Sequence, residues 1–144
     1  MNRASLYAIL AGASLVGMAA LSISAMVESP RSLMAPVDYE QARRSIESQG
    51  RLALGSCRGL EGRDRSVCQA QARANQRVAR AELEAAYRGT VVAASEAKVA
   101  RAKARFDVAR ARCSDSRGGE RIACVRSARS EKDKASADAK LAAS

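Results

Sequence analysis

Apolar positions recur at helical spacing through the chain after residue 37, which favours an all-α fold. The three helices that this spacing predicts cover about residues 38–54, 64–112 and 120–141. In the first, Tyr39, Ala42 and Ile46 share one face, and Asp38 is placed to cap the first turn. Gly50 is expected to weaken or end this helix. No proline follows residue 36, so long uninterrupted helices are expected.

The segment 64–112 is predicted to be one long helix with a seam of small residues. One apolar row recurs every seven positions, at Val78, Ala85, Val92, Val99 and Phe106. That period is typical of a coiled coil. A second row lies on nearly the opposite side, at Leu83, Tyr87 and Val91. The helix is therefore expected to touch more than one neighbour, and Gly89 is the position where it would most readily kink or break.

The third helix, residues 120–141, has a seam of Val125, Ala128 and Ala139 that Lys132 interrupts. The first and third helices together are about as long as the second. We therefore expect a Z-shaped arrangement of extended, alanine-rich antiparallel hairpins, coiled-coil-like, with the outer helices folded back on opposite halves of the long one. Because alanine buries little area, such a fold has a thin core, and self-association is expected.

The amino-terminal part of the chain has a different pattern. An uncharged, mostly apolar stretch separates Arg3 from Glu28. This is typical of a secretory signal peptide, expected over residues 1–24, followed by a proline-containing linker over residues 25–37. The alternative is an uncleaved anchor over residues 6–27, because such a length can span about 30 Å of hydrocarbon. The rest of the chain is thus expected in the bacterial periplasm, free or held at the inner membrane.

The chain contains an internal repeat built around four cysteines. They are Cys57, Cys68, Cys113 and Cys124, so the second pair follows the first by 56 residues with the same internal spacing. The match continues without a gap through Gly62 and Gly118. Upstream, the sequence around Phe106 matches that around Tyr39 at an offset of 67, which predicts eleven extra residues in the first copy. A repeat of this kind indicates one supersecondary unit used twice.

An exported chain meets an oxidising compartment, where disulfides are expected. A straight helix from Cys68 to Cys113 would separate these residues by about 68 Å, whereas a disulfide needs Cα atoms within about 7 Å. The predicted bonds are therefore Cys57–Cys68 and Cys113–Cys124, each stapling one turn. A redox-active pair, a metal site and free thiols are less favoured alternatives, because the spacing is not Cys-x-x-Cys and no His accompanies the cysteines.

The chain carries a net charge of +10, and part of it forms a row on the long predicted helix. The row consists of Arg73, Arg77, Arg80, Lys98, Arg101, Arg105 and Arg112. The simplest interpretation is a solvated face. The functional alternative is contact with an anionic surface, such as lipid headgroups, lipopolysaccharide or an acidic protein. Nucleic acid is disfavoured, because acidic residues interleave with the row and no stacking aromatics accompany it.

The chain has no His, which excludes Ser-His and Cys-His catalysis, haem ligation through His and most zinc sites. No glycine-rich phosphate loop and no nucleophile elbow are present either. We therefore expect no enzymatic activity, no cofactor, no metal and no small-molecule substrate. The expected function is that of an exported structural or interaction protein of the periplasm or envelope, with protein partners or copies of itself. The alternative is a basic binder of anionic polymers.

The segments Gly62–Cys68 and Gly118–Cys124 also carry a family resemblance. With the preceding cysteines they resemble the repeated unit Cys-x4-Gly-Asn-x-Lys-Asp-Val-Cys, followed by an alanine-rich helix, of small uncharacterised proteobacterial periplasmic proteins. Both copies here have another residue in place of the Asn. The resemblance covers about residues 38–140 and implies helices and a periplasmic location, but no activity. The composition is also similar to that of the alanine-rich periplasmic coil of TolA, a cell-envelope protein.

Overall fold

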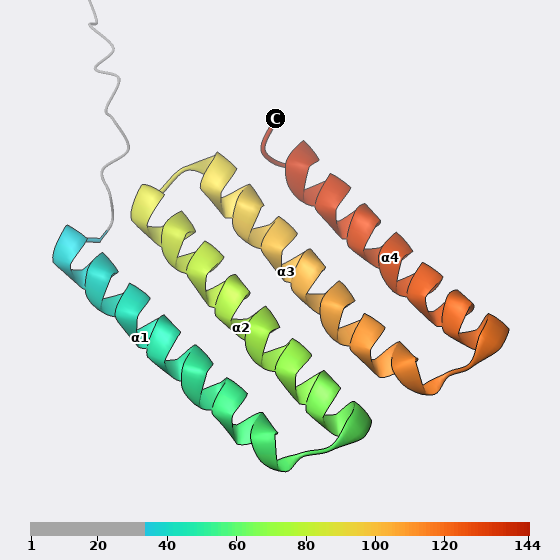
Figure 1. The fold of residues 1–144 in the computed structure, drawn as a ribbon. Helices are drawn as coiled ribbons and strands as arrows, with labels where there is room; N and C mark the ends of the chain where they lie inside the picture. Colours follow the sequence, from blue (N-terminus) through green and yellow to red (C-terminus); the bar gives the residue numbers. More distant parts are fainter. Residues whose placement is uncertain (1–33) are drawn as a thin grey trace, which may run out of the picture.

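The computed structural model describes residues 34–144, which form four helices in a single antiparallel layer (Figure 1). They are α1 (Pro36–Ser56), α2 (Gly62–Arg88), α3 (Val91–Arg112) and α4 (Gly118–Leu141). Each helix packs against its neighbours along the chain, and no other pair of helices makes more than a marginal contact. The predicted all-α class is confirmed for this part of the chain.

The expected boundaries at the start of the first helix are wrong. The helix begins at Pro36, after an N-cap at Ala35, so Asp38 lies in the first turn and does not cap it. Proline suits this position because the first helical N–H has no partner within the helix. The predicted signal peptide, the alternative anchor over 6–27 and most of the linker lie outside the described residues. Within residues 34–144, no helix has both the length and the apolar character needed to cross a membrane.

The predicted continuous helix over 64–112 is also wrong, because the chain reverses after α2. Gly89 has the left-handed conformation, with φ 60° and ψ 20°, and its N–H donates to the carbonyl of Ala85 at 2.9 Å. Thr90 then caps α3, since its side chain accepts a hydrogen bond from the N–H of Ala93 at 3.1 Å. A left-handed glycine followed by an N-cap ends one helix and starts the next. The layer therefore replaces the predicted Z of three helices.

The two halves of the layer are copies of one hairpin, with a constant offset of 56 residues. The α1–α2 and α3–α4 turns begin with short 3₁₀ helices at Cys57 and Cys113. The second helix of each hairpin starts at Gly62 or Gly118, which have φ of 51° and 53°. The eleven extra residues predicted for the first copy are absent, so the position equivalent to Phe106 is Gly50.

The core is thin and consists mainly of small side chains. Between α2 and α3, Ala74, Ala104 and Val108 form a buried cluster against which Val78 packs. Small side chains let helices approach closely but bury little area per turn. The predicted seven-residue row does not form one seam, because Val92 is 54% exposed. The expectation that the middle segment touches more than one neighbour is confirmed, since α2 packs on both α1 and α3.

Candidate functional site

The layer leaves two broad faces open on either side of its helices. We define face 1 by two ion pairs that cross from α2 to α3: Arg77 with Asp107, and Arg88 with Glu96 at 3.2 Å. Face 2 is defined by the pair of Glu82 on α2 with Arg101 on α3, at 2.6 Å. Residues 77 and 82 differ by about 140° around their helix, which places these pairs on opposite sides of the α2–α3 seam.

The reversal at Gly89 divides the predicted basic row between the two faces. By helical spacing, Arg73, Arg77 and Arg80 lie on face 1. The remaining residues, Lys98, Arg101, Arg105 and Arg112, lie on face 2. The row is therefore not one surface, as a continuous helix would have made it.

Three members of the row are neutralised within the layer. Besides the pairs of Arg77 and Arg101, Arg80 lies 3.5 Å from a carboxylate oxygen of Glu47. The other four are exposed and have no carboxylate partner within residues 34–144. These four are Arg73, Lys98, Arg105 and Arg112.

Both disulfides lie at the same end of the layer, in the turns of the two hairpins (Figure 1). The Cα atoms of Cys57 and Cys68 are 5.7 Å apart, and those of Cys113 and Cys124 are 5.8 Å apart. The pairing agrees with the prediction, but the separation argument behind it is wrong, because α2 and α3 fold back on each other. Local closure of each short turn is what selects these partners.

Arginines connect the two disulfide turns and brace the first. Arg63, at the start of α2, lies 2.6 Å from a carboxylate oxygen of Asp115 in the other turn. Arg65 donates to the backbone carbonyls of Leu60 and Arg58 at 2.5 and 3.0 Å. The guanidinium of Arg65 thus satisfies carbonyls that the turn leaves without helical partners.

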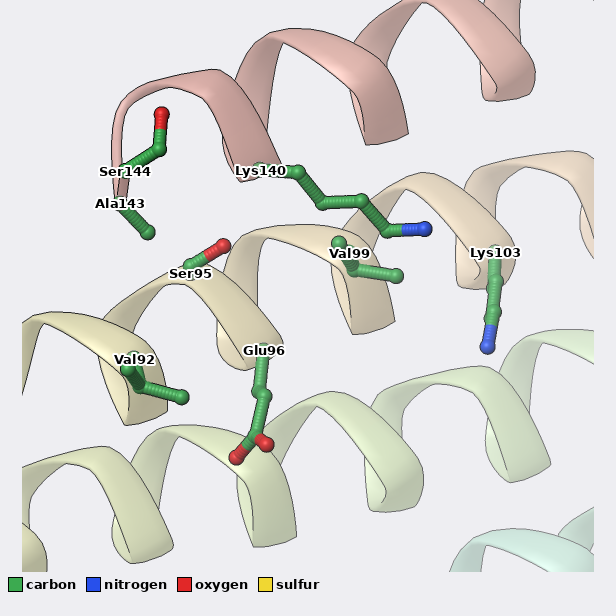
Figure 2. A pocket seen from close by; sticks show the side chains of 8 residues that line it. All are labelled: Val92, Ser95, Glu96, Val99, Lys103, Lys140, Ala143 and Ser144. Atoms are coloured by element: carbon green, nitrogen blue, oxygen red, sulfur yellow. The ribbon is translucent and has the colours of Figure 1, made fainter.

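Each hairpin carries a groove on face 1, and the repeat makes the two grooves equivalent. The groove of the α1–α2 hairpin has a volume of about 460 Å³ and that of the α3–α4 hairpin about 440 Å³. The first is lined by residues that include Tyr39, Arg43, Glu47 and Glu84. The residues 56 positions later line the second: Ser95, Val99, Lys103 and Lys140 (Figure 2). Two carboxylates in one groove are thus replaced by two amines in the other.

The charges of the first groove are satisfied within the protein. Tyr39 stacks on Tyr87 with ring centroids 4.4 Å apart, and its hydroxyl donates to Glu84 at 2.8 Å. This hydrogen bond, together with desolvation, raises the pKa of Tyr39 above its ordinary value, because a phenolate could not donate to the carboxylate. Glu47 is paired with Arg80.

The second groove has an apolar floor and amines at its rim. Val92 and Val99 of α3 form the floor, and Lys140 extends from α4 across α3 above Val99 (Figure 2). The hydroxyl of Ser95 already has a hydrogen-bond partner within the protein, since it donates to the carbonyl of Ala139 at 2.8 Å. Sequence reasoning did not single out Lys103 or Lys140, although the charge reversal between the repeats was available as a signal.

Farther along the α3–α4 seam, an aromatic side chain accommodates two cations. The Lys132 amine lies 5.4 Å from the centre of the Phe106 ring, and the Arg110 guanidinium lies 6.0 Å from it. Lys132 was expected to weaken this seam. Its contact with the ring provides a favourable position for a cation among apolar neighbours.

In residues 34–144, no three His, Cys, Asp or Glu side chains lie together in a way that could hold a metal ion. Comparisons of the chain with protein-family models, with curated proteins and with solved structures each give no match. The function is therefore inferred from the residues and geometry of this chain.

Proposed function

We propose that the protein is an exported, non-enzymatic helical protein of the bacterial periplasm or envelope, which acts by presenting the faces of its layer to other macromolecules. The observation that carries this proposal is the open layer itself, in which no second layer of described residues covers either face. Several large apolar side chains accordingly stay on the outside, among them Val91 at 64%, Val92 at 54% and Ile122 at 60% exposure. Exposed apolar groups on a thin scaffold are typical of interaction surfaces.

The cysteines support export. The four cysteines lie in two pairs at disulfide distance, and free cysteines are absent. Stable disulfides are rare in reducing cytosol and common in secreted proteins with small cores. The uncharged amino-terminal stretch supplies the matching export signal.

The middle of each outer edge of the layer is polar, with exposed apolar residues toward the helix ends at Val37, Leu52 and Leu141. This polar stretch favours the faces as binding surfaces. The side of α2 that meets α3 carries Ala70, Ala74 and Val78. The equivalent positions on the outer side of α4 are Arg126, Ser130 and Lys134, all exposed. On α1, Gln41, Arg44 and Ser48 likewise stand where α3 has Ala97, Ala100 and Ala104. In repeat proteins such polar outer sides terminate the array.

Export and interaction can be tested separately in a Gram-negative host. The intact mass of protein from the periplasm should correspond to loss of about residues 1–24, and reduction should add four hydrogens. A photo-crosslinking residue placed at Arg73 on face 1 should give defined adducts in cells. The same residue at Ser130 on the outer edge of α4 should give none. Cytosolic protein with free thiols would contradict export, and adducts from the edge alone would contradict binding through the faces.

A second candidate function is the binding of an anionic polymer or lipid surface. The observation that favours it is the group of unpaired cations on face 2, namely Lys98, Arg105 and Arg112. Retention on heparin should then fall steeply with salt, since polyanion binding releases counterions. Replacing Arg105 and Arg112 by Ala should flatten this dependence, whereas replacing the paired Arg80 by Ala should change it little.

A further inference from the structure

We infer that the groove of the α3–α4 hairpin is a binding site for a small organic carboxylate with an apolar body. Its floor is formed by Val92 and Val99, and the amines of Lys103 and Lys140 belong to its lining (Figure 2). This proposal goes beyond a structural role, and it departs from the expectation that the protein has no small-molecule ligand.

The lysine side chains of the groove are not paired with acidic side chains of the described layer. Neither Lys103 nor Lys140 forms an ion pair with an acidic side chain of the range 34–144. The acidic side chain that lines the groove, Glu96, is engaged by Arg88 at 3.2 Å. An anion bound in the groove would gain attraction from both unpaired amines.

In the equivalent groove of the first hairpin, the charged side chains at these positions have partners within the protein. At the two lysine positions it has Glu47 and Glu84. Both carboxylates have partners, because Glu47 pairs with Arg80 at 3.5 Å and Glu84 accepts from Tyr39 at 2.8 Å. The two grooves have nearly the same volume, so they differ in lining and not in size. The second hairpin lacks the internal partners that the first one has.

The floor indicates that the anion carries an apolar body. Val99 occupies the position of Arg43 in the first groove, and Ala143 the position of Tyr87, which stacks on Tyr39 beside that groove. Val92 leaves 54% of its surface exposed at the same floor. The volume of about 440 Å³ is in the range of small-molecule sites. Inorganic phosphate would satisfy the lysines but leave the valines uncovered, so an organic carboxylate fits both parts of the groove.

The probe for this site is 2-naphthoate, titrated into the oxidised full chain and followed by backbone amide resonances. We expect saturable shifts confined to residues 92–103 and 139–144. The neutral alcohol 2-naphthylmethanol and inorganic phosphate each provide one half of the recognition, so both should bind at least about tenfold more weakly. Equal binding of the alcohol or of phosphate would overturn the proposal, as would the absence of saturation.

Two variants test the groove with matched controls. Lys140→Glu introduces the charge of the first hairpin, and Ala143→Tyr introduces its aromatic side chain. Each should weaken naphthoate binding at least about tenfold. The controls Lys134→Glu, on the outer edge of α4, and Ala142→Tyr, outside the lining, should bind as the parent does. Amide spectra of all four establish folding, and equal losses in variants and controls would disprove the site.

Discussion

Gly89 is the residue on which the reversal between α2 and α3 depends. Its φ of 60° is costly for any residue with a Cβ. We expect Gly89→Ala to lower the free energy of unfolding by about 1 kcal/mol, measured by chemical denaturation of the oxidised protein. The control is Gly55→Ala in the last turn of α1, where a Cβ meets no atom within 4 Å. That change should raise stability by about 0.5 kcal/mol, and a loss at both sites would contradict this role for Gly89.

Tyr39 links the stability of the α1–α2 hairpin to pH. Its hydrogen bond to Glu84 raises its pKa above the ordinary value of 10.0 in the folded protein. The contribution of this group is therefore complete below pH 10, and it is lost as the pH rises through the higher folded pKa. We expect one phenol to ionise late in a titration followed by near-ultraviolet absorbance.

The titration of Tyr39 has a matched pair of variants. Glu84→Gln removes the carboxylate that accepts the bond and should bring the ionisation back toward the ordinary pKa. Glu82→Gln removes an equal charge two residues away, where the carboxylate pairs with Arg101 on face 2. That control should leave the late phenol unchanged, and an identical shift in both variants would show that Glu84 is not the cause.

At the scale of elements, the disulfides hold helices that differ in how well they are packed. The only residue that α1 itself buries is Gly50, whereas α3 buries six residues between two neighbours. Replacing Cys57 and Cys68 by Ala should lower stability by about 3 kcal/mol and release α1 while α2, α3 and α4 stay packed. Amide hydrogen exchange would then increase in α1 alone.

The companion double variant, with Ala at Cys113 and Cys124, should have a different pattern of exchange. Here α4 should exchange faster, while α3 remains protected by its seam with α2, which contains Ala104 and Val108. Faster exchange across all four helices in either variant would mean that the layer unfolds as one unit and that the hairpins are not separable.

The hairpins could be predicted from the sequence, but their mutual arrangement could not. Cysteine spacing and the repeat define each stapled turn locally. The reversal at Gly89 has local signals as well, a glycine followed by the capping Thr90. Gly50 was also expected to weaken or end a helix, but it is followed by Arg51 and lies inside α1. There the side chain of Gln76 covers the glycine so closely that a Cβ would lie 2.5 Å from it. The glycine inside α1 is therefore explained by tertiary contact, and one sequence does not display that contact.

Dependence on tertiary contact also explains why part of the candidate site was missed in the sequence analysis. The residues of the basic row were identified individually, but their division between two faces follows from the reversal. Lys103 and Lys140 belong to different helices, and only the folded hairpin brings them to one groove. The offset of 56 between the cysteine units already relates Lys140 to Glu84, whereas the misleading match between Tyr39 and Phe106 obscured the relation of Lys103 to Glu47.

At the scale of the whole molecule, an open layer of helices could add helices from other copies at its two outer edges. The seam between α2 and α3 shows which residues this chain uses to pack one helix on another, since it contains Ala74, Val78 and their neighbours. The equivalent residues on the outside of α4 are Ser130 and Lys134, both exposed. Docking a further helix there would bury a charge without a partner, which is costly. We therefore expect the oxidised protein to sediment as a monomer, in contrast to the self-association expected from the thin core alone.

Restoring the seam residues at this edge should reverse that behaviour. The triple variant Arg126→Ala, Ser130→Ala and Lys134→Val gives α4 the residues that α2 uses against α3. The outer side of α1 keeps Gln41, Arg44 and Ser48 between the exposed Val37 and Leu52, so the new apolar stretch on α4 matches its own copy best, and we expect a closed two-fold dimer. Sedimentation should show the mass doubling as concentration rises. The control Arg121→Ala, Ser127→Ala and Arg129→Val removes as much charge from exposed positions off this edge and should remain monomeric; a dimer there would mean that loss of charge drives association, wherever on α4 it occurs.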